Sequence, residues 1–153
     1  MSLKPDDDKE MMASIRTGMA TASFNRWAGF EVTHASTGRV ELRMRWKPET
    51  MGQYSGFLHA GLIAALLDTA CGAAAVTAIG PVLASHFAMN CLSPAIGDEF
   101  IATGWIVKAG KRQVFAAAEL HADQGDRGVK LVATGDAILI PSESGSTSST
   151  VKP

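Results

Sequence analysis

One stretch of the chain decides the fold: residues 58–79 read LHAGLIAALLDTACGAAAVTAI and are followed by Gly80 and Pro81. The apolar residues of this stretch cover every direction of a helix rather than one stripe, and such a helix must be surrounded by protein. Many of its residues are Ala or Gly, which let a sheet approach closely. We therefore predict one long central helix from Leu58 to Ile79, wrapped by a sheet and stopped by the Gly-Pro pair.

The same stretch does not favour a membrane span. His59 and Asp68 interrupt the apolar run from Phe57 to Leu83. A central Asp costs roughly 2.5–3.5 kcal/mol on the insertion scale, and the Ala and Gly residues around it offset little of that cost. We expect a buried helix in a soluble protein and no membrane partner.

The flanking sequence supplies a short helix and several strands. Residues from about Asp7 to Thr21 place Met11, Met12, Ile15 and Met19 at helical spacing behind an acidic first turn. Alternation around Val40 to Trp46 predicts a half-buried antiparallel strand, the clearer of two before the long helix. Four more strands are expected after the helix: Leu83–Leu92, Glu99–Lys108, Gln113–Ala122 and Val129–Ile140. The fold class is therefore α+β, with an antiparallel sheet curved around one helix.

Composition limits the classes of function. The chain has 153 residues, 46% of them hydrophobic, which suits one domain. We assign residues 1–140 to this domain and residues 141–153 to a disordered polar tail. The 14 basic and 15 acidic residues give a formal charge of −1, which argues against nucleic acid as a partner. No secretory signal is visible, so a cytoplasmic location is expected, with Cys71 and Cys91 reduced.

Asp68 is the candidate for chemistry. No Lys or Arg lies within eight positions of it, and a buried unpaired carboxylate costs several kcal/mol unless it has a function. An alternative stays open, in which Asp68 caps a second helix beginning at Thr69 or faces solvent at a helix end.

The start of the same helix is a second candidate. Residues 56–61 read GFLHAG, a turn followed by a helix start whose first amides have no partner within the helix. The N–H of Ala60, together with that of Gly61, could stabilise an oxyanion. Asp68 lies roughly 12 Å further along the axis at 1.5 Å per residue. One chain cannot bring both to the same carbonyl group, so we predict that a second subunit supplies the other half.

These residues carry a family resemblance. The string QYSGFLHAG at 53–61, LDTA at 67–70, LSPAIGD at 92–98 and VKAGK at 107–111 resemble the motifs of phenylacetate-pathway-type (PaaI-like) hotdog thioesterases. Together these motifs cover about Trp27 to Ile140. The most telling spacing is the helical Asp nine residues after the His. The resemblance implies a hotdog fold and hydrolysis of an acyl- or aryl-CoA thioester to free acid and coenzyme A.

The resemblance also implies roles for single residues. Asp68 would act as nucleophile or as general base for water, and Gln53 would hydrogen-bond the thioester carbonyl or the water. Ala60 would donate the oxyanion amide, although the family pattern is His-Gly-Gly and Ala60 departs from it. A hydroxyl residue on the next strand can accompany the carboxylate in related enzymes, and Ser85 and His86 are both candidates. No cofactor and no metal are expected, and the assembly would be a homodimer or homotetramer with active sites at the subunit interface.

Several assignments keep two interpretations. His59 could transfer protons, but at the join of loop and helix a structural role is favoured. Lys108, Lys111 and Arg112 could bind the phosphates of coenzyme A or form an ordinary solvated turn. The stripe of methionines could cover an acyl pocket or pack in the core. A hotdog hydratase is disfavoured because Tyr54, not an acid, precedes His59 by five residues; a non-catalytic acyl-CoA sensor is the other alternative.

Overall fold

The computed structural model describes residues 5–142. The helices are α1 (Pro5–Thr21), α2 (Ser23–Ala28), α3 (Pro48–Met51) and α4 (Ala60–Ile79), with a 3-10 turn at Gly125–Arg127. The strands are β1 (Glu31–Ser36), β2 (Arg39–Arg45), β3 (Val82–Cys91), β4 (Glu99–Ala109), β5 (Val114–Asp123) and β6 (Val129–Pro141). The predicted order of helix, two strands, long helix and four strands is confirmed. Most of the tail predicted for 141–153 lies outside the described residues, and Pro141 still belongs to β6.

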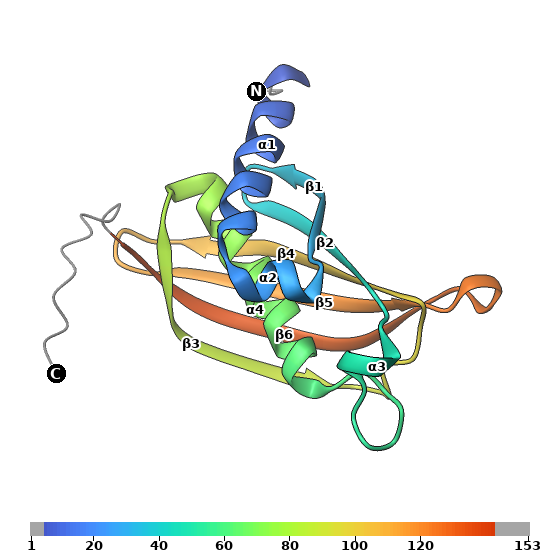
Figure 1. Cartoon of the computed structure of the whole chain (residues 1–153). Helices are drawn as coiled ribbons and strands as arrows, with labels where there is room; N and C mark the ends of the chain where they lie inside the picture. Colours follow the sequence, from blue (N-terminus) through green and yellow to red (C-terminus); the bar gives the residue numbers. More distant parts are fainter. Residues whose placement is uncertain (1–4, 143–153) are drawn as a thin grey trace, which may run out of the picture.

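All six strands form one antiparallel sheet in the order β1-β2-β4-β5-β6-β3. Figure 1 shows the sheet curving around α4, with β1 and β3 at its two edges. This is the curved sheet and central helix that the sequence predicts. By length and composition α4 could also span a membrane, but half of its most apolar window is buried inside the protein, as in the core helix of a soluble domain.

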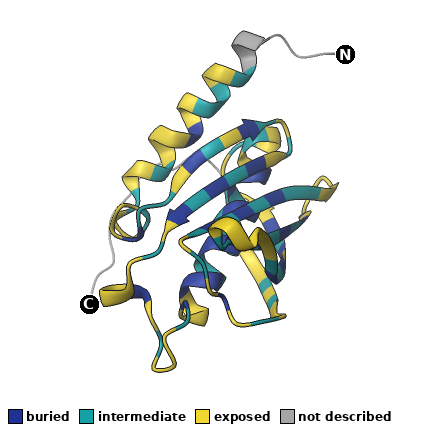
Figure 2. Ribbon diagram, turned by 90° about the vertical axis from the view of Figure 1, so that its right-hand side faces the viewer, coloured by how far each residue is buried: buried dark blue, intermediate teal, exposed yellow. Residues whose placement is uncertain are grey.

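Glycine sets how closely the helix meets the sheet. A Cβ atom at Gly104 of β4 would overlap the backbone carbonyl of Ala70 in α4. At Gly135 of β6, it would lie 3.2 Å from the Leu67 side chain. Around these contacts the core is fully buried, including Leu66, Phe100 and Leu120, and it forms the dark blue interior of Figure 2. The small residues expected to admit the sheet therefore lie on both partners of the contact.

The helix α4 differs from its prediction in its start and in its surroundings. It begins at Ala60 rather than Leu58, because Leu58 forms an isolated bridge with Gly52 and His59 caps the helix. It runs unbroken through Asp68, so the alternative in which Asp68 caps a second helix is wrong. The helix is also not surrounded within one chain, since Val76 and Ile79 are both 37% exposed. Its apolar surface on that side needs cover from elsewhere.

Two short helices were not predicted. In α2, Phe24 and Trp27 are three residues apart. This pattern is too short to distinguish a helix from an irregular segment that leads into a strand. It ends at Gly29, which adopts φ 75°, so the Gly was the available signal for a helix end. α3 has Pro48 at its first turn, the usual position for proline in a helix.

Candidate active site

Asp68 lies in the middle of α4, in the wall of a cleft of about 460 Å³. The other walls come from α1, from Asn25 of α2, from the start of β3 and from Leu139 of β6. The lining is mainly apolar, and the Asp68 side chain is half-buried. The carboxylate therefore faces a space that could hold an apolar group of a ligand.

Burial changes the protonation of this site. Desolvation raises the pKa of Asp68 above its usual value, and no basic side chain within residues 5–142 pairs with it. Burial also raises the pKa of the neighbouring Cys71 thiol to about 12, with the negative charges of Asp68 and Asp136 adding to the effect. Cys71 is thus a neutral thiol near pH 7, and it is fully buried and does not line the cleft.

The start of α4 borders a different cleft, of about 520 Å³. Gln53, His59 and Ala60 line it together with Leu92 and Pro94. The Gln53 backbone closes a tight turn, donating to Phe57 O at 2.8 Å and accepting from Gly56 N at 2.9 Å. Its side-chain Oε1 accepts from the N–H of Ser55, so its amide NH₂ group is the part left to donate to a ligand.

His59 holds the beginning of the helix. Its Nδ1 accepts a hydrogen bond from the N–H of Gly61 at 2.9 Å, which makes it the N-cap. The structural role favoured for His59 thus has a visible basis. Because His59 occupies the Gly61 amide, the N–H of Ala60 is the one of the two that has no partner within the described part of the chain.

The two halves of the predicted site are separate in one chain. The Asp68 cleft and the Ala60 cleft share no lining residue, and Asp68 follows Ala60 by eight positions on the helix, roughly 12 Å along the axis. Both clefts adjoin β3, however. Val82, Leu83 and Ala84 at its start line the first cleft, and Cys91 at its end lines the second.

The residues predicted to bind substrate lie on exposed surface. Ser85 and His86 are both exposed on β3, and neither lines the Asp68 cleft. Ser85 sits at an irregularity between Ala84 and His86, where its hydroxyl donates to Ile138 O at 3.1 Å. Lys108, Lys111 and Arg112 are exposed around the turn between β4 and β5. This turn is at the same end of the sheet as the start of β3, since β6 residue Leu139 pairs with both Val114 and Ala84.

Metal ligands do not gather in the part of the chain that the structure describes. No group of three or more His, Cys, Asp or Glu residues lies close enough together to hold a metal ion there. His34 and His121 lie on separate strands, β1 and β5. The expectation that no metal or cofactor is needed stays a prediction.

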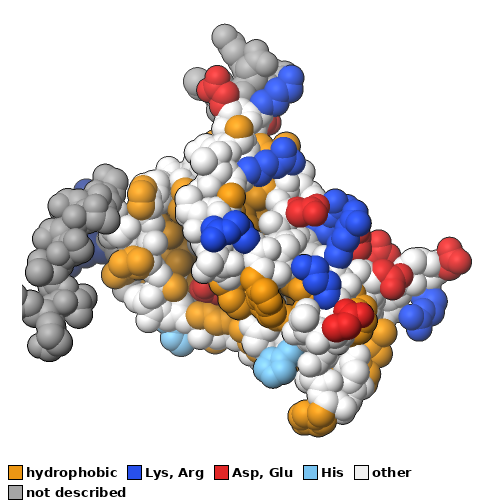
Figure 3. All heavy atoms as spheres, in the orientation of Figure 1, with side chains coloured by type: hydrophobic (Ala, Val, Ile, Leu, Met, Phe, Trp, Pro, Cys, Tyr) orange, Lys and Arg blue, Asp and Glu red, His pale blue; other side chains and the backbone are white. Residues whose placement is uncertain are grey.

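The sequence left open whether the methionine stripe of α1 forms a wall of the Asp68 cleft. Gly18 and Met19 of α1 and Asn25 of α2 line it. Figure 3 shows hydrophobic side chains exposed on the face of the molecule that carries α1, while charged side chains gather toward β1 and β2. The stripe of methionines hinted at this wall, but the stripe fits a core helix equally well. The position of α1 over the cleft depends on tertiary contacts that the pattern does not encode.

Three comparisons with known proteins agree with this architecture. The family model of the thioesterase superfamily matches residues 55–129. A thioesterase family protein from Silicibacter pomeroyi has a crystal structure that is 32% identical, with a TM-score of 0.80, over 85% of this chain and 96% of that one. The medium/long-chain acyl-CoA thioesterase YigI of Escherichia coli is 26% identical over 121 residues, 66% of this chain and 76% of YigI.

A further solved structure supports the fold alone. The E. coli PaaI protein from the phenylacetic acid degradation operon is 19% identical, with a TM-score of 0.73, over 86% of this chain and 96% of PaaI. The resemblance noted in the motifs thus extends to the curved sheet and its central helix. The chain belongs to the thioesterase superfamily of hotdog-fold thioester hydrolases.

Proposed function

We propose that this protein hydrolyses acyl-CoA thioesters to a free acid and coenzyme A, with Asp68 as the catalytic carboxylate. The observation that carries the proposal is the position of Asp68: half-buried in an apolar cleft, without a basic partner among the described residues, and with a raised pKa. A structural carboxylate would be paired or solvated, since burial without a partner is costly. Catalytic groups are the common exception to this rule.

Two routes of hydrolysis are compatible with this position. In the first, Asp68 attacks the thioester carbonyl, coenzyme A leaves as the thiolate and takes a proton from water, and a second water attacks the Asp68 carbonyl of the mixed anhydride to release the acid. In the second, Asp68 takes a proton from water, which attacks the carbonyl directly. Under single-turnover conditions in ¹⁸O-labelled water, only the first route leaves the product acid initially unlabelled and transfers label to Asp68.

The N–H of Ala60 is the proposed oxyanion donor. It lies at the first turn of a 20-residue helix, where the helix dipole adds to the attraction for negative charge. The family pattern has Gly at the position of Ala60, but the methyl group of Ala60 takes no hydrogen bond from this N–H and leaves it free to donate. Gln53 lines the same cleft and would donate its NH₂ group to the thioester carbonyl or to the attacking water. Losing one oxyanion donor typically costs about 3–4 kcal/mol of transition-state stabilisation.

A homodimer paired through β3 would bring these groups together. β3 pairs only with β6 within residues 5–142, so its other edge presents unpaired backbone N–H and C=O groups. If two copies pair antiparallel along this edge, the start of β3 in one copy meets its end in the other. The Asp68 cleft of one subunit would then face the Ala60 cleft of its partner, and each dimer would hold two complete sites.

The substrate we propose is a coenzyme A ester of an aliphatic acid. The apolar lining of the Asp68 cleft suits a hydrocarbon chain, and the similar protein YigI is named for medium- and long-chain acyl groups. The exposed basic turn of Lys108, Lys111 and Arg112 offers cations for the phosphates of coenzyme A. Ser85 and His86 lie beside the edge of β3 and would face the partner subunit in this dimer. A cytoplasmic location, where acyl-CoA is made and used, completes the proposal.

Two other functions fit the fold less well. A hydratase would need a His and an acid at the α and β carbons of the substrate, whereas Nδ1 of His59 is occupied by Gly61 and Tyr54 is fully exposed. A non-catalytic acyl-CoA sensor would have no use for a desolvated carboxylate in its binding cleft. The sensor remains the outcome to exclude by experiment.

The deciding experiment measures release of free thiol from aliphatic and aromatic acyl-CoAs by wild type and by Asp68→Asn. We expect the substitution to lower kcat at least about a hundredfold while acyl-CoA binding is retained. Asp126→Asn, in the exposed turn before β6, is the matched control and should keep wild-type activity. Equal activity of wild type and Asp68→Asn would refute the role of Asp68. Binding without turnover in either protein would identify a sensor.

A further inference from the structure

We infer that α1 is the wall that limits the length of the acyl chain, with Gly18 and Gly72 leaving the room that a long chain occupies and Met19 closing its far end. The inference rests on the proposed acyl-CoA hydrolysis and assigns the chain-length selection to named residues. It concerns the cleft of about 460 Å³ that runs from Asp68 between α1 and α4.

The shape of this cleft suits a chain that points away from the reacting carbonyl. Asp68 and Thr69 are its polar part on α4, and Val76, Val82 and Leu139 form apolar walls further along. Gly72 lies four residues after Asp68, one turn along the same face of α4. An acyl group whose carbonyl is held near Asp68 and that follows α4 therefore passes Gly72, in a cleft that α1 also lines.

The two glycines provide space rather than backbone freedom. Gly18 and Gly72 both lie inside helices, and neither has a positive φ. Glycine inside a helix costs about 1 kcal/mol relative to alanine, so its presence needs another reason. A Cβ atom at either position would have no heavy atom within 4 Å, and both residues line the cleft. Both positions therefore have room for a larger side chain, and both line the cleft.

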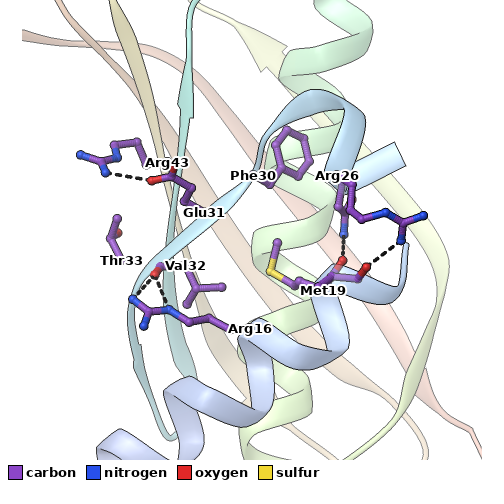
Figure 4. Close-up of a pocket in the computed structure, with 10 residues that line it drawn as sticks. Arg16, Met19, Arg26, Phe30, Glu31, Val32, Thr33 and Arg43 are labelled. Carbon is purple, nitrogen blue, oxygen red and sulfur yellow. Dashed lines mark hydrogen bonds and ion pairs between the residues drawn. The ribbon is translucent and has the colours of Figure 1, made fainter. Parts of the chain in front are cut away.

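Packing and hydrogen bonds both hold the wall in place, since Met11, Met12 and Met19 pack against the core. Ile15 is buried, but the other described side chains of α1 are exposed or only partly buried. Arg16 donates to Val32 O of β1 through Nε and Nη2, at 3.2 and 3.0 Å. Arg26 donates to the last carbonyls of α1, those of Ala20 and Thr21, at 2.7 and 3.0 Å. Figure 4 shows both arginines, one on each side of Met19.

Met19 separates this cleft from a second cavity. The cavity of about 420 Å³ shown in Figure 4 lies between α1, α2 and β1, and Met19 and Asn25 line both spaces. Shortening Met19 would open the acyl cleft toward this second cavity. The structure therefore predicts changes of opposite sign: filling Gly18 or Gly72 shortens the accepted chain, and truncating Met19 lengthens it.

The test compares kcat/KM for lauroyl-CoA with kcat/KM for butyryl-CoA. Each methylene kept out of an apolar site costs about 0.8 kcal/mol, or about fourfold, so a leucine that excludes two methylenes lowers the ratio about 15-fold. We expect this for Gly72→Leu and Gly18→Leu, with any loss of butyryl-CoA hydrolysis smaller than the loss of lauroyl-CoA hydrolysis. Met19→Ala should raise the ratio. Ala13→Leu on α1 and Ala78→Leu on α4 are exposed positions outside the cleft and serve as controls.

The result that overturns the inference is a wild-type ratio in all three cleft variants, or equal losses for both substrates. Because Met19→Ala predicts a gain, a general loss of folding cannot imitate the expected pattern. If wild type hydrolyses no acyl-CoA, the proposed function fails. In that case binding of S-dodecyl- and S-butyl-CoA thioethers, measured by calorimetry, tests the chain-length wall by the same ratio.

Discussion

At the scale of single residues, the proposed catalytic group Asp68 lowers the stability of the fold when it is ionised. Its pKa in the folded protein is raised by desolvation, so folding favours the protonated form. The stability that this group contributes is present below its unfolded pKa, near 3.9, and is lost as pH rises through its folded pKa. Ionising Asp68 in the folded protein therefore costs stability, and such costs are common in active sites.

The direction of the Asp68 pKa shift predicts how Asp68→Asn affects folding stability. The amide has the same shape and no charge, so at pH 7 the variant should unfold at a higher temperature than wild type even though it loses activity. The difference should shrink as pH falls through the folded pKa of Asp68 and be absent well below the unfolded pKa of about 3.9, where wild type is protonated in both states. Calorimetry across this pH range measures it. A variant less stable than wild type at pH 7 would contradict the desolvation argument.

Residue chemistry was the part of the site most accessible from the sequence. Asp68 stands out because charge is rare in an apolar helix, and His59 because it lies at a loop-to-helix join. Gly18 gave no such signal, since one glycine in a short amphipathic helix is indistinguishable from a weak helix position. Its meaning depends on α4 being opposite, which is a tertiary contact.

At the scale of elements, the contact between α4 and β4 fixes the core. A side chain at Gly104 would overlap the Ala70 carbonyl and approach Cys71 N to 2.9 Å, and backbone cannot move aside as a rotamer can. At Gly135, the nearest atoms belong to the Leu67 and Phe87 side chains, at 3.2 to 3.3 Å. The same added methyl group therefore overlaps backbone in β4, whereas in β6 a shift of a few tenths of an ångström by its neighbours would admit it.

We predict that Gly104→Ala destabilises the protein by about 3 kcal/mol or more, at the upper end of overpacking effects, because α4 must shift away from the sheet. Gly135→Ala should cost less, about 1 kcal/mol, since side chains can adjust. Urea unfolding followed by circular dichroism gives both free energies. Similar values for the two variants would show that the helix can move off β4 at little cost.

Helices and strands were predictable where their hydrophobic pattern extended over many residues. The four strands after α4 begin and end within two residues of their predicted bounds, because alternation and Gly or Pro punctuation act together there. β1 lacks clear alternation and was expected without bounds. α2 has six residues, and its two aromatic side chains are about half exposed, so hydrophobic periodicity could not identify it.

At the scale of the whole molecule, the single chain is incomplete in three places. The edge of β3 is unpaired within the described residues, Leu83 and Leu92 near its ends are 62% and 54% exposed, and one side of α4 is uncovered. The predicted apolar surroundings of α4 are therefore only partly supplied by its own sheet. Sequence pattern indicates that a surface must be covered, but it does not distinguish cover by the same chain from cover by another copy.

The proposed dimer makes a prediction that no single-chain site can meet. Asp68→Asn removes the carboxylate and Gln53→Ala removes the opposite donor, so each variant alone should be nearly inactive. In a mixed dimer, however, one of the two sites receives Asp68 from one subunit and Gln53 from the other, both unchanged. Random reassociation of equal amounts makes half of the dimers mixed, so activity should return to about a quarter of the wild-type value.

Size-exclusion chromatography with light scattering would first establish the dimer or tetramer. Thiol release after unfolding and refolding the mixture together would then measure the recovery. Refolding each variant separately before mixing is the control and should restore little activity until subunits exchange. If a dimeric mixture stays inactive after joint refolding, the two residues of each site come from the same subunit. That result would contradict the site formed between subunits paired through β3.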